Sequence, residues 1–274
     1  MIRDLTNAQY HAHPAISSSD VKAVALKSLA HWKGAVRKSS SAFDLGTAVH
    51  ALLLEPHLDL VVKGPADRRG NEWKDKKLGA DLDGKLLLTS GEYDIAMSMR
   101  DAVMQHDVAA EMLQRSGLIA EASFFATDPE TGLQIKCRPD AVHPESGLLV
   151  DVKTTKTASP EGFAREVQAY GYDIQAAFYQ HVLTLNDIRC RPMTFICVEK
   201  EPPFAVCVHV LSDSYVAHGM RRAEDAIRKI ITATRNNSFT TGWPSVNVIE
   251  PPRWLGLDAE ADDADDDADD VIDF

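Results

Sequence analysis

The sequence predicts a mixed α/β (α+β) protein with a central mixed β-sheet flanked by helices. Two observations support this fold class. Apolar residues recur at helical spacing near the start of the chain and again over residues 160–185 and 213–235. Short strand-like runs separated by turn residues occupy residues 118–153 and 193–211. A chain that passes from helices through a β-meander, a crossover helix and further strands is typical of a layered α/β core.

The N-terminal part is predicted to be mainly helical. Residues 17–33 begin with a Ser/Asp cluster, which is a helix start, and continue with apolar residues at helical spacing. Residues 43–54 are strongly apolar, and residues 91–115 are also predicted to form a helix. The polar segment 62–85 is rich in Gly, Lys, Arg and Asp, so a long basic loop is expected there. Loops of that length are usually functional or disordered.

Strands are predicted where short apolar runs lie between turn signals such as Asp128-Pro129 and Gly147. A long helix over residues 160–185 is expected to connect the third strand to the fourth. The predicted strands are residues 118–126, 133–142, 147–153, 193–199 and 204–211.

The net charge of −12 is unevenly distributed along the chain. Residues 258–274 hold ten acidic residues and no Lys or Arg, which leaves 31 acidic and 29 basic residues elsewhere. A nearly neutral body can carry a basic groove on one face, so the net charge does not exclude nucleic acid as a ligand. We expect one large folded domain over residues 1–250 and an acidic, disordered tail over residues 251–274.

Several classes of protein are disfavoured by the sequence. No apolar run approaches the roughly 20 residues that span a bilayer, and the first residues lack the apolar stretch of a secretory signal. The four cysteines form no C-x-x-C pair, which is typical of reduced thiols. We therefore expect a cytoplasmic protein with no membrane contact.

Acidic and basic residues occur at defined positions in the predicted strands. Asp140 ends the second strand, and Asp151 and Lys153 lie on the third. Because residues two apart on a strand share one side, Asp151 and Lys153 point one way while Val150 and Val152 point into the core. Two charged groups in a strand of this kind need a chemical reason.

Hydrolysis of a phosphodiester supplies such a reason. Mg²⁺ prefers hard oxygen ligands, which Asp140, Asp151 and the Val152 carbonyl can provide. A bound cation lowers the pKa of a water molecule and stabilises developing negative charge. Lys153 would orient that water or stabilise the charged transition state.

These motifs also resemble a known superfamily. P-D followed by D-x-K resembles the PD-(D/E)xK nuclease signature, which implies a restriction-endonuclease-like core. Together with S-S-S-D-V-K, G-T-A-V-H, the Arg68-Arg69 pair, V-D-V-K-T and Q-x-x-x-Y, it resembles the RecE-type exodeoxyribonucleases (exonuclease VIII) of phages and prophages. This family lies in the RecB/lambda-exonuclease branch, and the resemblance spans roughly residues 17–235. It implies that the protein acts in a bacterial host cell.

The resemblance implies a catalytic set and a cofactor. Glu121 matches the acid that many members carry on the first strand. Mg²⁺ is the expected cofactor; Mn²⁺ is expected to substitute for it, and Ca²⁺ to bind without efficient cleavage because its coordination is looser. The implied metal ligands are His50, Asp140, Asp151 and the Val152 carbonyl, and the catalytic set also includes Lys153.

The helix after the D-x-K motif carries a polar stripe. Gln168, Tyr172, Gln175 and Tyr179 are spaced four, three and four residues apart, so one continuous helix would place them on one face. We predict that Gln175 and Tyr179 belong to the catalytic centre and that Tyr172 contacts DNA. A packed polar face is the alternative.

The polar segment 62–85 is a candidate DNA clamp. Arg68, Arg69 and Lys74 would contact phosphates near a DNA end, and Trp73 would stack on a base. A solvated loop explains the same composition equally well.

The resemblance implies a 5′-to-3′ exonuclease acting on the ends of linear double-stranded DNA. Its 3′ single-stranded tails would serve a recombinase or a single-strand annealing protein, and a ring-shaped homo-trimer or homo-tetramer is expected. Two alternatives stay open. One is a structure-specific or single-strand DNA endo- or exonuclease of the same superfamily, and the other is a non-catalytic module that binds DNA ends or loads a partner.

Overall fold

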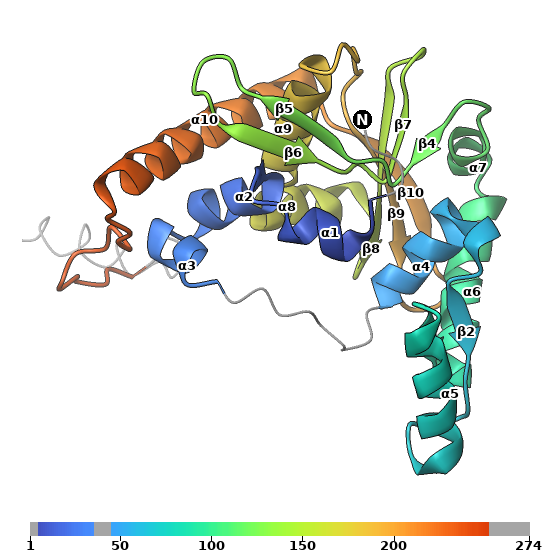
Figure 1. The fold of residues 1–274 in the computed structure, drawn as a ribbon. Coiled ribbons are helices and arrows are strands. Elements are labelled where there is room, and N and C mark those ends of the chain that lie inside the picture. Colours follow the sequence, from blue (N-terminus) through green and yellow to red (C-terminus); the bar gives the residue numbers. More distant parts are fainter. Residues whose placement is uncertain (1–4, 36–44, 252–274) are drawn as a thin grey trace, which may run out of the picture. The chain divides into compact units, whose positions relative to one another are not determined.

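The largest sheet has five strands in the order β10-β9-β8-β7-β4, and it is mixed, as the sequence predicts. Strand β8 runs parallel to β9, whereas the other neighbouring pairs are antiparallel. Figure 1 shows this sheet in the computed structural model, which describes residues 5–35 and 45–251. The strands are β4 (Ile119–Ala120), β7 (Ala141–His143), β8 (Leu148–Thr155), β9 (Thr194–Glu199) and β10 (Val206–Val210).

Two smaller sheets accompany it. The first has the order β1-β6-β5 and the second pairs β2 with β3. Consecutive strands therefore change sheets: the chain leaves β4 for β5 and leaves β6 for β7. The strands of these sheets are β1 (Ile16–Ser17), β5 (Phe124–Thr127), β6 (Gln134–Cys137), β2 (Val61–Lys63) and β3 (Leu86–Leu88).

The continuous strands predicted over residues 118–126 and 133–142 are therefore each broken. Glu121 has a φ of 49°, in the left-handed region that a strand cannot use. Pro139 lacks the N–H that a sheet ladder needs. Each break lets one chain segment serve two sheets, and each break carries an acidic residue.

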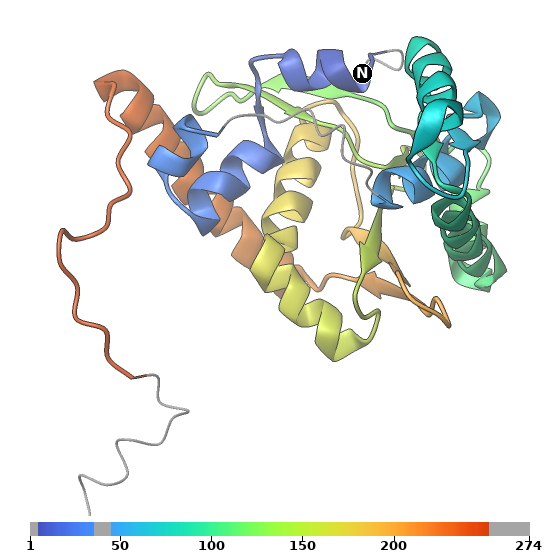
Figure 2. The same cartoon turned by 90° about the horizontal axis from the view of Figure 1, so that it is seen from below.

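Helices cover both faces of the five-stranded sheet (Figure 1). On one face α9 contacts β5 and β6 of the three-stranded sheet and shares a core with Leu149 of β8 and Phe195 of β9, while α2, α8 and α10 pack against α9. Figure 2 shows α9 and α10 side by side with α2 against them. On the other face α4 and α6 pack over β8 and β9. The helices are α1 (Asn7–Ala12), α2 (Ser18–Leu26), α3 (Leu29–Lys33), α4 (Leu45–Leu54), α5 (Gly70–Leu82), α6 (Ser90–Gln105), α7 (Asp107–Leu113), α8 (Pro160–Tyr170), α9 (Tyr172–Thr184) and α10 (Asp213–Asn236), with a 3-10 turn, η1 (Pro56–Leu58).

Strand β8 separates the two hydrophobic cores. Leu149 joins the core beneath α9, whereas Val150 and Val152 join the core beneath α4 and α6. The alternation that the sequence predicts is thus confirmed for the two valines. It places Asp151 and Lys153 on the side of the sheet that α9 covers.

Three predicted helices are each divided in two. Ser28 accepts a hydrogen bond from His31 N–H and so starts α3 separately from α2. Gly171 has a φ of 64° and ends α8 before α9 begins. His106 divides the helix expected over residues 91–115. The helix expected over residues 43–54 is α4, and its first two residues lie outside the described part of the chain.

The long basic loop expected over residues 62–85 is wrong, because this segment contains the end of β2 and the helix α5. Its charges pair along the helix: Glu72 with Lys76 at 3.2 Å, and Lys77 with Asp81. Such pairs four residues apart stabilise a helix that has almost no apolar face. The helix was not predicted because the segment is rich in charged residues and has glycines at both ends, a composition that is typical of loops.

The chain divides into two units, Met1–Thr241 and Gly242–Phe274. Residues 242–251 contain no helix or strand, and the remainder of the acidic tail lies outside the described residues. None of the described helices combines the length and the apolar character that crossing a bilayer requires.

Gly219 lets α10 approach the backbone of α9 closely. A Cβ at this position would lie 2.1 Å from the carbonyl oxygen of Asp173 and 2.3 Å from its carbon. We expect Gly219→Ala to lower the free energy of unfolding by about 2–3 kcal/mol, because backbone atoms cannot move aside. Urea unfolding measures this loss.

The matched control is Gly79→Ala on α5, where no atom lies within 4 Å of the added Cβ. This change is expected to leave stability unchanged or to raise it by about 0.5–1 kcal/mol. Equal stability of the two variants would contradict the close approach of α9 and α10.

Candidate active site

The two strand breaks bring Glu121 and Asp140 together. Glu121 follows β4 and Asp140 precedes β7, and these strands are antiparallel neighbours. The Glu121 N–H donates to the Asp140 carbonyl oxygen at 3.0 Å. The left-handed conformation of Glu121 and the adjacent Pro139 thus place two carboxylates at one end of the sheet.

Helix α4 adds His50 to this pair. The Nδ1 atom of His50 lies 3.4 Å from Oδ2 of Asp140. One ligand atom each from His50, Glu121 and Asp140 lies within 4.8 Å of the other two. An imidazole nitrogen and two carboxylates suit a hard divalent cation, so these residues fit the metal that the resemblance implies.

Asp140 is oriented by the backbone of the D-x-K motif. The Val152 N–H donates to Asp140 Oδ2 at 2.6 Å. Burial raises the pKa of Asp140 to about 6, although the neighbouring His50 opposes that rise. Burial also raises the pKa of Glu121 to about 8, and the charges of Asp140 and Glu55 add to the effect. Carboxyls packed this closely lose their protons most readily when a cation is present.

Asp151 and Lys153 form an ion pair beneath α9. The Lys153 ammonium contacts Oδ2 of Asp151, whose side chain is 3% exposed. Gln175 Nε2 donates to the other carboxylate oxygen at 2.5 Å. Burial opposes the charge on Lys153, but Asp151 and Asp140 outweigh it and raise the lysine pKa. The ammonium therefore stays protonated at neutral pH and acts as a donor and a positive charge.

Side chains of α9 cover the Asp151–Lys153 ion pair. The Tyr172 ring lies 4.7 Å from the Lys153 ammonium and stacks on Phe195. Tyr179 is buried, and this burial raises the pKa of its hydroxyl well above the usual value. Gln175, Tyr179 and Tyr172 therefore lie near the centre, whereas the exposed Gln168 lies on α8 and leaves the expected stripe.

Residues 17–243 match the family described as a PDDEXK-like domain of unknown function (DUF3799). The chain belongs to this PDDEXK-like family. Its fold is the mixed α/β core of the PD-(D/E)xK superfamily, so the superfamily resemblance read from the sequence is confirmed. The narrower RecE-type resemblance stays a prediction.

Two solved structures resemble the chain to different degrees. A protein of Eubacterium rectale described as a putative exonuclease is similar with a TM-score of 0.59 at 16% identity, over 93% of this chain and 98% of the other. A phage related exonuclease of Haemophilus somnus 129PT has a TM-score of 0.37 at 10% identity, over 84% of this chain and 99% of the other. No curated protein matches the chain. At 16% identity the first similarity concerns the fold alone.

We refer to His50, Glu121 and Asp140 as the metal group; it contains two of the ligands that the resemblance implies, while Asp151 and the Val152 carbonyl stay predicted ligands. Glu121 joins His50 and Asp140, whereas Asp151 is engaged by Lys153 and Gln175. The Val152 backbone contributes through its N–H, which holds Asp140.

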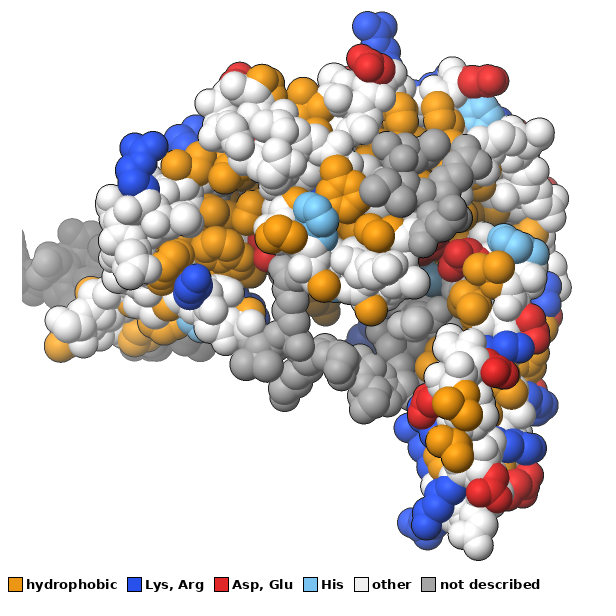
Figure 3. Space-filling model, viewed as in Figure 1, with side chains coloured by type: hydrophobic (Ala, Val, Ile, Leu, Met, Phe, Trp, Pro, Cys, Tyr) orange, Lys and Arg blue, Asp and Glu red, His pale blue; other side chains and the backbone are white. Residues whose placement is uncertain are grey.

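The predicted DNA clamp lies on a separate element. Arg68 pairs with Glu92 at 2.7 Å and its guanidinium lies 5.6 Å from the Trp73 ring centre. Arg69 caps α5, and both Arg69 and Lys74 are exposed. Figure 3 shows acidic and basic side chains interspersed over α5, so this helix does not present a purely basic surface.

Two residues near the centre had no role assigned from sequence. Lys22 on α2 lies beside Gln175 and Tyr172. Glu55 follows α4 and raises the pKa of Glu121 through its charge. Both occur in or beside motifs that carry the family resemblance, S-S-S-D-V-K and G-T-A-V-H, so their positions were visible although their roles were not.

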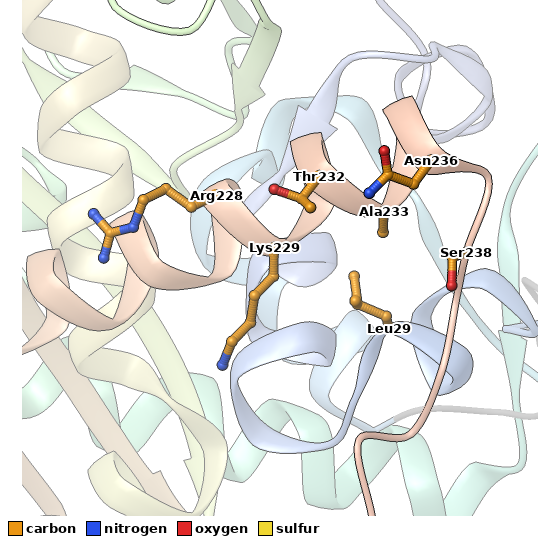
Figure 4. Close-up of a pocket in the computed structure, with 7 residues that line it drawn as sticks. All are labelled: Leu29, Arg228, Lys229, Thr232, Ala233, Asn236 and Ser238. Atoms are coloured by element: carbon orange, nitrogen blue, oxygen red, sulfur yellow. The ribbon is translucent and has the colours of Figure 1, made fainter.

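A pocket of about 300 Å³ lies away from these residues, between α3 and the C-terminal end of α10 (Figure 4). Its cations, Arg228 and Lys229, pair with Asp225 on the same helix. None of the candidate catalytic residues lines it. The pocket is lined by Leu29, Arg228, Lys229, Thr232, Ala233, Asn236 and Ser238.

Because the pKa of Glu121 is raised in the folded protein, the free energy of unfolding should depend on pH. Between its ordinary value of 4.5 and about 8, the folded protein holds a proton on Glu121 that the unfolded chain has lost. This group therefore lowers stability as pH rises through that window. We expect Glu121→Gln to melt at a higher temperature than the wild type in EDTA, with a gap that widens from pH 5 to 8 and then stays constant.

Added Mg²⁺ should raise the melting temperature of the wild type more than that of Glu121→Gln. The control is Glu130→Gln at an exposed position, for which no pH-dependent gap is expected. A constant gap for Glu121→Gln across this range would show that Glu121 is not buried beside the other carboxyls.

Proposed function

We propose that this PDDEXK-like domain is a Mg²⁺-dependent 5′-to-3′ exodeoxyribonuclease that acts on the ends of linear double-stranded DNA. The observation that carries the proposal is one arrangement of side chains. The protonated Lys153 is held against Asp151, and Asp140 of the metal group (His50, Glu121 and Asp140) accepts from Val152 N–H of the same strand. Such a combination suits hydrolysis of a phosphodiester, in which an attacking water is activated and negative charge develops on the phosphate.

Each residue has a distinct task in this proposal. His50, Glu121 and Asp140 would hold the cation, which when bound would lower the pKa of a water molecule and neutralise charge on the phosphate. Asp151 keeps the Lys153 ammonium in place, and Gln175 fixes Asp151 in turn. The Lys153 ammonium then donates to a phosphate oxygen and stabilises the charge that develops there.

The choice of substrate and direction rests on resemblance. The Eubacterium rectale protein is described as a putative exonuclease, and the motifs of this chain resemble those of RecE-type enzymes. We therefore propose that the product is a 3′ single-stranded tail used by a recombinase or annealing protein in the cytoplasm of a bacterial host. A ring-shaped homo-trimer or homo-tetramer that encircles DNA belongs to the same proposal.

Linear duplex DNA labelled at either the 5′ or the 3′ end tests this function. With Mg²⁺, the 5′ label is expected to be released early as short products, while the 3′ label stays on long strands and a covalently closed circle stays intact. Early release of the 3′ label would reverse the proposed direction. Loss of the closed circle would instead show an endonuclease.

A further inference from the structure

A second lysine lies beside the catalytic pair, on a different helix. Lys22 of α2 places its ammonium 3.4 Å from Gln175 Oε1, and the same Gln175 donates from Nε2 to Asp151. The ammonium lies 5.7 Å from the centre of the Tyr172 ring, to which Lys153 also points from 4.7 Å. Two cations therefore lie near one aromatic ring at the candidate active site.

The aliphatic part of the Lys22 side chain packs against Gly171, where no side chain is in its way. A Cβ added to Gly171 would lie 3.3 Å from both Cγ and Cδ of Lys22. The glycine that divides α8 from α9 thus contacts the aliphatic part of this side chain. This packing directs the ammonium toward the D-x-K strand rather than into solvent.

The two acids whose charges act on Lys22, Asp151 and Asp173, are engaged by other cations. Asp151 contacts the Lys153 ammonium, and the buried Asp173 pairs with Arg222 at 2.9 and 3.0 Å. Burial, followed by the neighbouring charge of Lys153, lowers the pKa of Lys22 to about 8, because Asp151 and Asp173 offset only part of these effects. A half-buried ammonium in this position is stabilised when an additional anion binds.

We propose that Lys22 binds a non-bridging oxygen of the DNA phosphate next to the one that is cut. This inference rests on the proposed function, because DNA is the polyanion that would enter the site. In this proposal Lys153 contacts the reacting phosphate, and Lys22, which also lies near the Tyr172 ring, contacts the next phosphate along the strand. The amide of Gln175 couples the two positions, since it accepts from Lys22 and donates to Asp151.

The test compares DNA affinities in Ca²⁺, where cleavage is expected to be inefficient. Lys22→Met keeps most of the stem and removes the charge, whereas Lys22→Arg keeps the charge. Lys27→Met is the matched control, because Lys27 is exposed at the end of the same helix. The readout is the Kd for a linear duplex at several salt concentrations, with melting temperatures recorded for every variant.

We expect Lys22→Met to raise the Kd roughly tenfold or more, as for the loss of a charge-assisted hydrogen bond. The slope of log affinity against log salt concentration should fall by about 0.7–0.9 for one lost phosphate contact. Lys22→Arg should restore most of the affinity, and Lys27→Met should stay near the wild type. Equal affinity of Lys22→Met and Lys27→Met, or failure of Lys22→Arg to restore binding, would overturn the assignment.

The two proposals fail in distinguishable ways. If the wild type binds DNA and Lys22→Met binds it weakly, but no Mg²⁺-dependent cutting occurs, the nuclease is rejected and the phosphate contact stands. If the wild type cuts DNA and Lys22→Met binds as well as the wild type, only the Lys22 assignment is rejected.

Discussion

Replacing Lys153 with alanine is expected to slow Mg²⁺-dependent release of nucleotides by about a hundredfold to a thousandfold, while DNA binding persists. The reason is the protonated ammonium that Asp151 and Asp140 maintain at neutral pH. Removing it takes away a charge that matters most when negative charge develops on the phosphate. Single-turnover rates with Mg²⁺ and affinities with Ca²⁺ separate the two effects.

Two further variants keep this test specific. Lys153→Met retains much of the stem volume that packs on Tyr172, so its loss of rate reports the charge rather than a cavity. Lys156→Ala removes an exposed lysine immediately after the same strand and is expected to cut at the wild-type rate. A Lys153→Met enzyme with a wild-type single-turnover rate would refute the role of the ammonium.

Asp140→Asn is expected to weaken binding of Mg²⁺ or Mn²⁺ by at least about tenfold to a hundredfold and to remove metal-dependent activity with it. The asparagine oxygen can still accept from Val152 N–H, so the backbone of the motif should keep its place. What disappears is the negative charge beside His50 and Glu121. Calorimetric titration of the protein with Mn²⁺ measures the affinity without any substrate.

The control for this change is Asp187→Asn, in an exposed turn after α9. Asparagine is well tolerated in the left-handed conformation that Asp187 adopts, with a φ of 61°. Its metal affinity should match the wild type. Unchanged Mn²⁺ affinity in Asp140→Asn would place the cation elsewhere in the protein.

Short-range patterns predicted the central part of the site well. The alternation of β8 follows directly from the two-residue period of a strand, so Val150 and Val152 were assigned to the core correctly. Asp151 and Lys153 consequently share the opposite side, where they form an ion pair. The fold class and the superfamily were likewise accessible from the order of elements and from the P-D and D-x-K motifs.

Breaks within elements were harder to predict, because they depend on tertiary contacts. The left-handed φ of Glu121 and the change of sheet at Pro139 leave no clear signal in hydrophobic periodicity. Gly171 was visible in the sequence, but a single glycine within an apolar stretch is often tolerated inside a helix. These breaks nevertheless decide which acids meet, and they bring Glu121 beside His50 and Asp140.

Lys22 illustrates a second limit of sequence reasoning. A lysine four residues after Ser18 on an amphipathic helix is usually a solvated surface residue. Only the packing of α2 against α9, and the gap left by Gly171, bring its ammonium beside Gln175. Contacts between residues separated by about 150 positions cannot be read from local spacing.

The central claim is that Lys153, Asp151 and the metal group of His50, Glu121 and Asp140 form one centre that hydrolyses DNA. The most direct measurement is the release of acid-soluble nucleotides from linear duplex DNA by the full chain, with Mg²⁺ and then with EDTA. We predict release that begins with Mg²⁺, stops with EDTA and is absent in Lys153→Met. Equal release by the wild type and Lys153→Met, or no release by a folded wild type that binds Mg²⁺, would contradict it.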